Sequence, residues 1–141
     1  MTGAAHWEHF PHQADVGIRG IGPSLAAAFE QAARAMTAVI TEPERITPRL
    51  SVHIQCRATD PELLLFDWLN ALVYEMATRH MLFSEFKVDI AGAQLNADAR
   101  GEAVDIDRHE PRVEIKGATF TELRVTQDAD GLWLAQCVLD V

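Results

Sequence analysis

The chain has 141 residues, of which 48% are apolar and 23% charged, a composition typical of a globular protein rather than a disordered one. Its net charge is −9 and its Lys and Arg residues form no cluster, so direct binding to DNA or RNA is not expected. No stretch approaches the ~20 apolar residues that span a bilayer. The N-terminus lacks the basic and apolar regions of a signal peptide. We therefore expect a single domain, residues 1–141, that works in the cytoplasm.

The first third of the chain predicts two short extended segments followed by a helix. Residues 6–10 alternate weakly between polar and apolar, and Pro11 is expected to interrupt this strand. Residues 15–20 form a second extended piece. Ser24 is a typical N-cap, the apolar residues that follow recur at helical spacing, and Pro43 is expected to end the helix.

The middle of the chain predicts a strand and a second helix. Residues 46–58 alternate with a period of two, as in a half-buried strand. Asp60 and Pro61 form a typical helix start, and this helix is expected to end near Arg79. It is apolar on most sides, which favours a central position in the fold. Three of its polar residues share one face, where a tie to a neighbouring loop is a simpler interpretation than an active site: Asp67, Asn70 and Tyr74.

The remainder of the chain predicts strands and turns. We expect strands over residues 86–90, 113–120, 122–127 and 132–139, with turns at 91–92 and 128–131. The order of elements predicts an α+β domain with a largely antiparallel β-sheet and two α-helices.

Two carboxylates stand out because they lie in apolar surroundings. Asp15 lies among apolar and small residues, and Asp140 follows an apolar run directly before the terminal carboxylate of Val141. A charge at the end of a buried strand is costly unless a positive group meets it. A hard cation such as Ca²⁺ or Mg²⁺ binds carboxylates and is one interpretation. The alternative is that Asp15 caps a loop and Asp140 lies at a frayed end.

Histidines recur every three residues near the N-terminus, at His6, His9 and His12. In an extended segment this spacing places neighbouring members on opposite faces, and no cysteine completes a zinc set. A zinc site is therefore not expected, although His12 alone could approach Asp15.

The other polar candidates lie in the second half of the chain. Lys116 stands between apolar and small residues, which suits a lysine directed at a site, with a snorkelling strand lysine as the alternative. A polar group suits a solvated connection better than a second acidic site: Asp105, Asp107, His109 and Glu110.

No sequence motif marks the protein as a self-sufficient enzyme. Cys56 and Cys137 lie in apolar runs and are expected to be buried free thiols. There is no phosphate-binding loop, no GxSxG motif and no Cys–His nucleophile signature, so no catalytic residue is predicted. The acidic charge suits a hard cation or a basic protein partner, and equally a plain soluble surface.

Taken together and in order, several segments resemble the archease family, and this resemblance covers nearly the whole chain. The segments that carry it are His12–Ile18, Asp67–Leu72, Leu82–Ser84, Gly101-Glu102, Arg108-His109, Lys116–Phe120 and Val138–Val141.

The resemblance implies a protein cofactor of the RtcB-type RNA-splicing ligase. Such a protein promotes GTP-dependent guanylylation of the ligase and supports multiple turnover in tRNA splicing and RNA repair, reaching RNA only through the ligase. Carried over by position, Asp15, Asp140 and the terminal carboxylate of Val141 would bind a divalent metal. Ca²⁺ is expected, with Mg²⁺ or Mn²⁺ as alternatives. Lys116 would be a functional residue near the same site.

The chain departs from the family pattern in two segments. Gln13 stands where the family usually has Thr, and Phe120-Thr121 stand where it has Tyr-His, so Thr121 is not predicted as a site residue. Two other functions remain alternatives. One is a metal-dependent hydrolase that uses Asp15, Asp140 and His12, and the other is a chaperone-like binding module with a structural metal.

Overall fold

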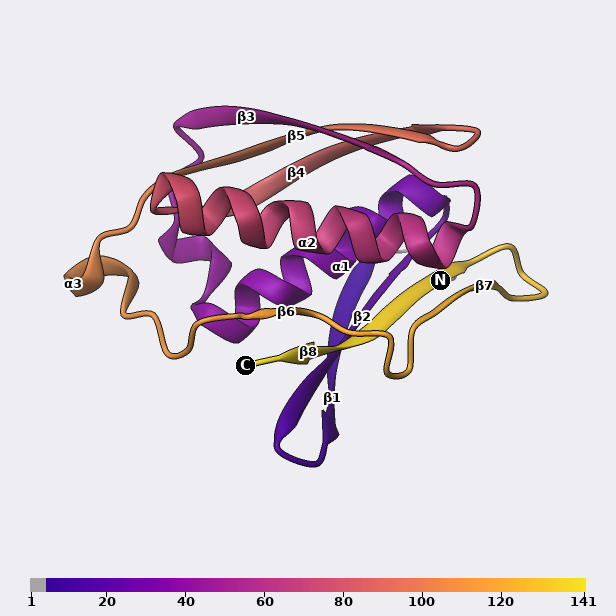
Figure 1. Ribbon diagram of the computed structural model, residues 1–141, viewed down its shortest axis with the longest axis horizontal. Helices are drawn as coiled ribbons and strands as arrows, with labels where there is room; N and C mark the ends of the chain where they lie inside the picture. Colours follow the sequence, from indigo (N-terminus) through magenta and orange to yellow (C-terminus); the bar gives the residue numbers. More distant parts are fainter. Residues whose placement is uncertain (1–4) are drawn as a thin grey trace.

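The computed structural model describes residues 5–141 and contains two antiparallel sheets and two long helices (Figure 1). Residues 1–4, where the sequence predicts no signal peptide, lie outside the described part of the chain. The larger sheet has the strand order β1-β2-β8-β6, with β7 also paired to β8. Its strands are β1 (His6–His12), β2 (Asp15–Gly22), β6 (Gly117–Ala118), β7 (Arg124–Gln127) and β8 (Trp133–Asp140).

The smaller sheet has the order β3-β5-β4. Its strands are β3 (Leu50–Arg57), β4 (Met81–Ala91) and β5 (Gln94–Ala103). The helical segments are α1 (Leu25–Ile40), a 3₁₀ turn (Pro43–Arg45), α2 (Pro61–Arg79) and the short α3 (Ile106–His109). Helices α1 and α2 each contact strands of both sheets, and the main apolar cluster includes residues of both. Within residues 5–141, no helix is long and apolar enough to cross a membrane.

These elements confirm the predicted α+β class, and the predicted helix starts are confirmed residue by residue. The Ser24 hydroxyl accepts a hydrogen bond of 3.1 Å from the Ala27 amide. The Asp60 carboxylate accepts one of 2.8 Å from the Glu62 amide, with Pro61 at the first helical position. The helices are joined in the core, where the indole N–H of the fully buried Trp68 donates to the Phe29 carbonyl at 3.1 Å.

Strand β1 runs through Pro11, which the sequence predicts to interrupt it. Since β1 is an edge strand, its chain needs hydrogen-bond donors on one side only, and proline is tolerated there.

Strand β5 has no counterpart among the predicted strands, although it is the central strand of the smaller sheet. Its buried positions are mostly Ala and Gly, and its exposed ones include Gln, Asp and Arg, so its β-propensity is low. The predicted strand over 113–120 is reduced to Gly117–Ala118, and the predicted single sheet is divided into two.

Candidate functional site

The two acidic residues singled out in the sequence lie at the same end of the larger sheet. Strands β2 and β8 pair antiparallel from Gly22–Trp133 to Val16–Leu139. Asp15 directly precedes Val16 and Asp140 directly follows Leu139, so these aspartates occupy the next facing positions. Residues that face each other across an antiparallel pair project to the same side of the sheet. Asp140 is exposed and Asp15 is partly buried.

Strand β6 brings Lys116 to the same end of the sheet. The Lys116 amide donates a hydrogen bond of 2.8 Å to the Asp140 carbonyl, and Gly117 pairs with Asp140 in the ladder. The Lys116 side chain is exposed, whereas Val141 packs partly against the core. Residues far apart in the sequence therefore meet where the chain ends.

Helix α2 holds this short strand in place. The Asn70 carboxamide oxygen accepts a hydrogen bond of 3.0 Å from the Ala118 amide. This is the helix-to-loop tie that the polar face of α2 predicts. Asn70 alone makes it, since Asp67 and Tyr74 are exposed side chains without such a bond in the described chain.

The donor chemistry at this end suits a hard cation. Among residues 5–141, no three side chains of His, Cys, Asp or Glu gather closely enough to hold a metal ion. The donors that the resemblance implies at this end are the carboxylates of Asp15 and Asp140 and that of Val141. Carboxylate oxygens are the ligands that Ca²⁺ and Mg²⁺ take, with water completing the shell.

The histidines of β1 are divided between two environments. His12 faces Asp15 across the β1–β2 turn, so it is the histidine that lies near that carboxylate-bearing residue, as the sequence allows. The His9 ring is engaged elsewhere, where Nε2 donates to the Ala35 carbonyl at 2.8 Å. Gln13, one of the departures from the family pattern, lies in the turn with a φ of 54°, in the left-handed region.

A buried polar cluster centred on Glu102 has no role in the sequence prediction. The Glu102 side chain accepts hydrogen bonds from the Arg108 guanidinium (2.7 Å), the Thr47 amide (2.8 Å) and His109 Nε2 (2.9 Å). His109 Nδ1 accepts from the Asp105 amide, which leaves Nε2 as the donor. His109 is fully buried, so the prediction of a solvated connection is wrong at this residue.

In the sequence, these residues are marked only by the family resemblance. Gly101-Glu102 and Arg108-His109 are among the segments that carry it, but spacing alone does not show that they meet. In the structure the cluster joins β5, the loop before β3, and α3.

Glu102 makes the stability of this region depend on pH. The Arg108 guanidinium, assisted by the Thr47 amide and His109, holds the pKa of Glu102 well below its ordinary value of 4.5, although burial opposes this shift. A carboxyl with a depressed pKa stabilises the fold above its ordinary pKa and loses that contribution as the pH falls. We expect Glu102→Gln to lower the free energy of unfolding at neutral pH. The difference from wild type should shrink below about pH 4.5.

Urea unfolding at a series of pH values measures this difference. Asp89→Asn, a change at an exposed position of β4, is the control and should show little difference at any pH. A Glu102→Gln difference that stays constant from neutral to acid pH would contradict the prediction.

The cysteines lack the properties of nucleophiles. Both are free, as expected, although Cys56 is only partly buried. Burial raises the pKa of Cys137 to about 12 and that of Cys56 to about 11, the latter with a smaller contribution from Asp67. Neither thiol would be ionised appreciably at neutral pH.

Comparison with known proteins agrees with the resemblance. A family model described as the Archease protein family (MTH1598/TM1083) matches residues 7–141. The protein archease of Pyrococcus furiosus is 37% identical over 139 residues, which cover 96% of this chain and 98% of that protein. The protein archease of Sulfolobus acidocaldarius is 35% identical over 137 residues, covering 96% and 98%.

Two solved structures share the fold. The solution structure of Methanobacterium thermoautotrophicum protein 1598 has a TM-score of 0.84 and 35% identity, covering 96% of this chain and 98% of that one. The crystal structure of a Thermotoga maritima archease, described as a possible chaperone, has a TM-score of 0.58 and 19% identity, covering 95% and 96%. The family match and these full-length relatives show that the chain belongs to the archease family.

Proposed function

We propose that this protein is a cofactor of an RtcB-type RNA ligase and not itself a ligase. It promotes GTP-dependent guanylylation of the ligase and so supports multiple turnover in tRNA splicing and RNA repair. The observation that carries the proposal is the meeting of Asp15, Lys116 and Asp140 at the C-terminal end of β8. These are the residues that the family resemblance implies to be functional.

Each residue has a role that follows from its chemistry. Asp15, Asp140 and the Val141 carboxylate would hold a divalent cation, with Ca²⁺ first and Mg²⁺ or Mn²⁺ as alternatives. When bound, such a cation neutralises and orients phosphate oxygens. The Lys116 backbone adjoins Asp140, and its exposed ammonium group is a positive charge suited to a phosphate of GTP. The β6–β8 pairing fixes the Lys116 backbone against Asp140.

The overall charge supports a partner rather than direct RNA binding. A net charge of −9 repels a phosphate backbone but favours contact with a basic protein surface. An enzyme that joins RNA needs Lys and Arg to contact phosphates. The two proteins are thus expected to have complementary surface charges, and the ligase alone is expected to bind RNA.

The test measures ligase guanylylation and RNA joining with GTP, a divalent metal and an excess of RNA over ligase, with and without this protein. We expect both rates to rise and each ligase molecule to complete several rounds. The absence of any acceleration would overturn the proposal. Metal-dependent hydrolysis by the isolated protein would then favour the hydrolase alternative, and protection of the ligase from aggregation would favour the chaperone-like module.

A further inference from the structure

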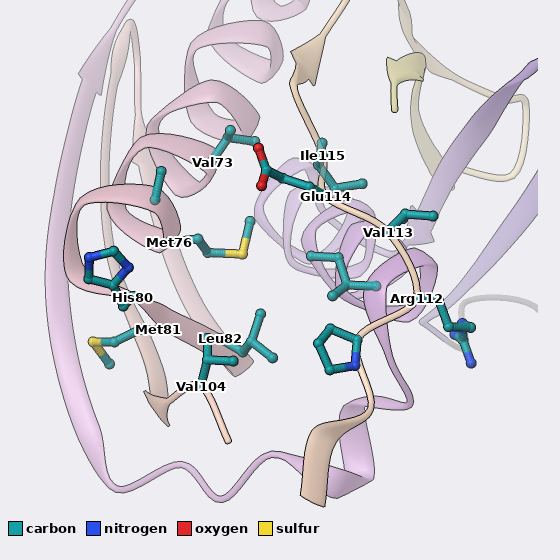
Figure 2. Close-up of a pocket in the computed structure, with 13 residues that line it drawn as sticks. Val73, Met76, His80, Met81, Leu82, Val104, Arg112, Val113, Glu114 and Ile115 are labelled. Atoms are coloured by element: carbon teal, nitrogen blue, oxygen red, sulfur yellow. The ribbon is translucent and has the colours of Figure 1, made fainter. Parts of the chain in front are cut away.

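A largely apolar groove lies between the C-terminal part of α2 and the segment that leads to β6 (Figure 2). Its volume is about 580 Å³, within the range of ~300–1,000 Å³ typical of ligand pockets. Its floor and walls include Val73, Met76, Met81, Leu82 and Ile115. The two methionines are unbranched and flexible, so this surface can adapt to the shape of an inserted side chain.

The edge of the groove carries one carboxylate, Glu114, and one guanidinium, Arg112. The exposed Glu114 side chain makes no hydrogen bond or ion pair within residues 5–141. Arg112 also lines the groove, but its guanidinium donates to the Ala38 carbonyl at 2.7 Å and is turned away in Figure 2. His80, at the end of α2, is the remaining titratable residue of the lining.

The groove adjoins the end of the sheet that carries the proposed function. Ile115 lines it, and the amide of the next residue, Lys116, donates to the Asp140 carbonyl. The groove and this end of the sheet are thus adjacent along the chain, at Ile115 and Lys116.

We propose that this groove docks a segment of the ligase that carries a large apolar side chain next to Lys or Arg. The proposal rests on the proposed function and adds the surface by which the partner is held. The apolar side chain would fill the groove, and the adjacent cation would pair with Glu114. An RNA-binding enzyme is rich in such cations, and this chain is acidic, so the charges are complementary.

Two substitutions test the groove, each with a matched control. Ala77→Arg places a long side chain in the groove from an exposed helix position, and Thr78→Arg places the same side chain one residue further along α2, outside the lining. Glu114→Lys reverses the charge at the edge, and Asp89→Lys makes the same change on β4.

The experiment measures direct binding to the ligase by titration calorimetry, together with the concentration of this protein that gives half-maximal acceleration. We expect Ala77→Arg and Glu114→Lys to raise both the Kd and this concentration about tenfold or more. The maximal acceleration at saturation should stay unchanged. The controls should match wild type, and urea unfolding should show that all four variants are folded.

The failure of this inference differs from the failure of the proposed function. If wild type accelerates the ligase but both groove variants bind with its Kd, the docking proposal is overturned and the activator function stands. If wild type binds without accelerating and the groove variants do not bind, the docking proposal stands and the activator function fails. The protein could also form a dimer that Ala77→Arg dissociates without changing the Kd for the ligase. That result would overturn the docking proposal, because a second copy of this chain would then occupy the groove.

Discussion

Replacing Asp140 with Asn is expected to abolish the acceleration of ligase guanylylation while changing the free energy of unfolding by less than about 0.5 kcal/mol. The side chain is exposed, and the backbone groups of Asp140 that pair with Lys116 and Gly117 remain. The change removes one of the negative charges available to a cation at this end of the sheet. Because the proposed function makes Asp140 a direct ligand, its replacement should weaken cation binding by at least about 100-fold, since outer-shell changes alone cost about 10–100-fold.

Calorimetric titration with Ca²⁺ and the guanylylation assay measure the two effects of Asp140→Asn. Asp89→Asn removes an exposed carboxylate from the smaller sheet and should leave both unchanged. The chaperone-like module with a structural metal predicts the opposite pair of results. Asp140→Asn would then lower the free energy of unfolding by several kcal/mol, and the remaining folded protein would accelerate the ligase normally.

Replacing Gly101 with Ala is expected to lower the free energy of unfolding by about 3 kcal/mol or more, at the upper end of overpacking effects. A Cβ atom at this position would lie 1.8 Å from the Leu82 carbonyl oxygen and 2.7 Å from the Phe83 Cα. These are backbone atoms of β4, next to the register shift between Phe83 and Glu85. They can move only if the pairing of β4 with β5 is broken.

Urea unfolding measured by circular dichroism gives the free energy for Gly101→Ala and for a control, Gly117→Ala. At Gly117 the added Cβ would meet only the Asn70 carboxamide oxygen, at 3.1 Å, and a side chain can adjust by a few tenths of an ångström. We expect the control to lose less than about 1 kcal/mol. A Gly101→Ala protein as stable as this control would show that β4 yields at the bulge.

The sequence by itself determined the elements whose signals are local. Ser24 and the pair Asp60-Pro61 start helices because their side chains or ring satisfy the requirements of the first turn within three residues. The predicted turn at 128–131 is likewise local, since the Asp128 carboxylate accepts from the Asp130 and Leu132 amides. The alternation of β8 predicts the burial of Ala135, Cys137 and Leu139, because that pattern is a property of the strand itself, whereas Gln136 and Val138 on its other face are buried by neighbouring elements.

Tertiary structure decided the elements that depend on their neighbours. Strand β5 has low intrinsic propensity and exists because β3 and β4 supply hydrogen-bond partners on both sides. His109 is buried because Glu102, on a strand that the sequence does not predict, provides its partner. Pro11 remains in β1 because, within residues 5–141, no strand pairs with that edge of the sheet.

The candidate site combines both kinds of information. The family resemblance selects Asp15, Lys116 and Asp140 by residue type and position, but gives no distance between them. Their meeting depends on the β2–β8 register and on the β6–β8 pairing, which join parts of the chain more than a hundred residues apart in the first case and about two dozen in the second. A register shift of one residue would turn each side chain to the other face of the sheet. The sequence thus determined which groups are available, and long-range strand pairing decided that they lie together.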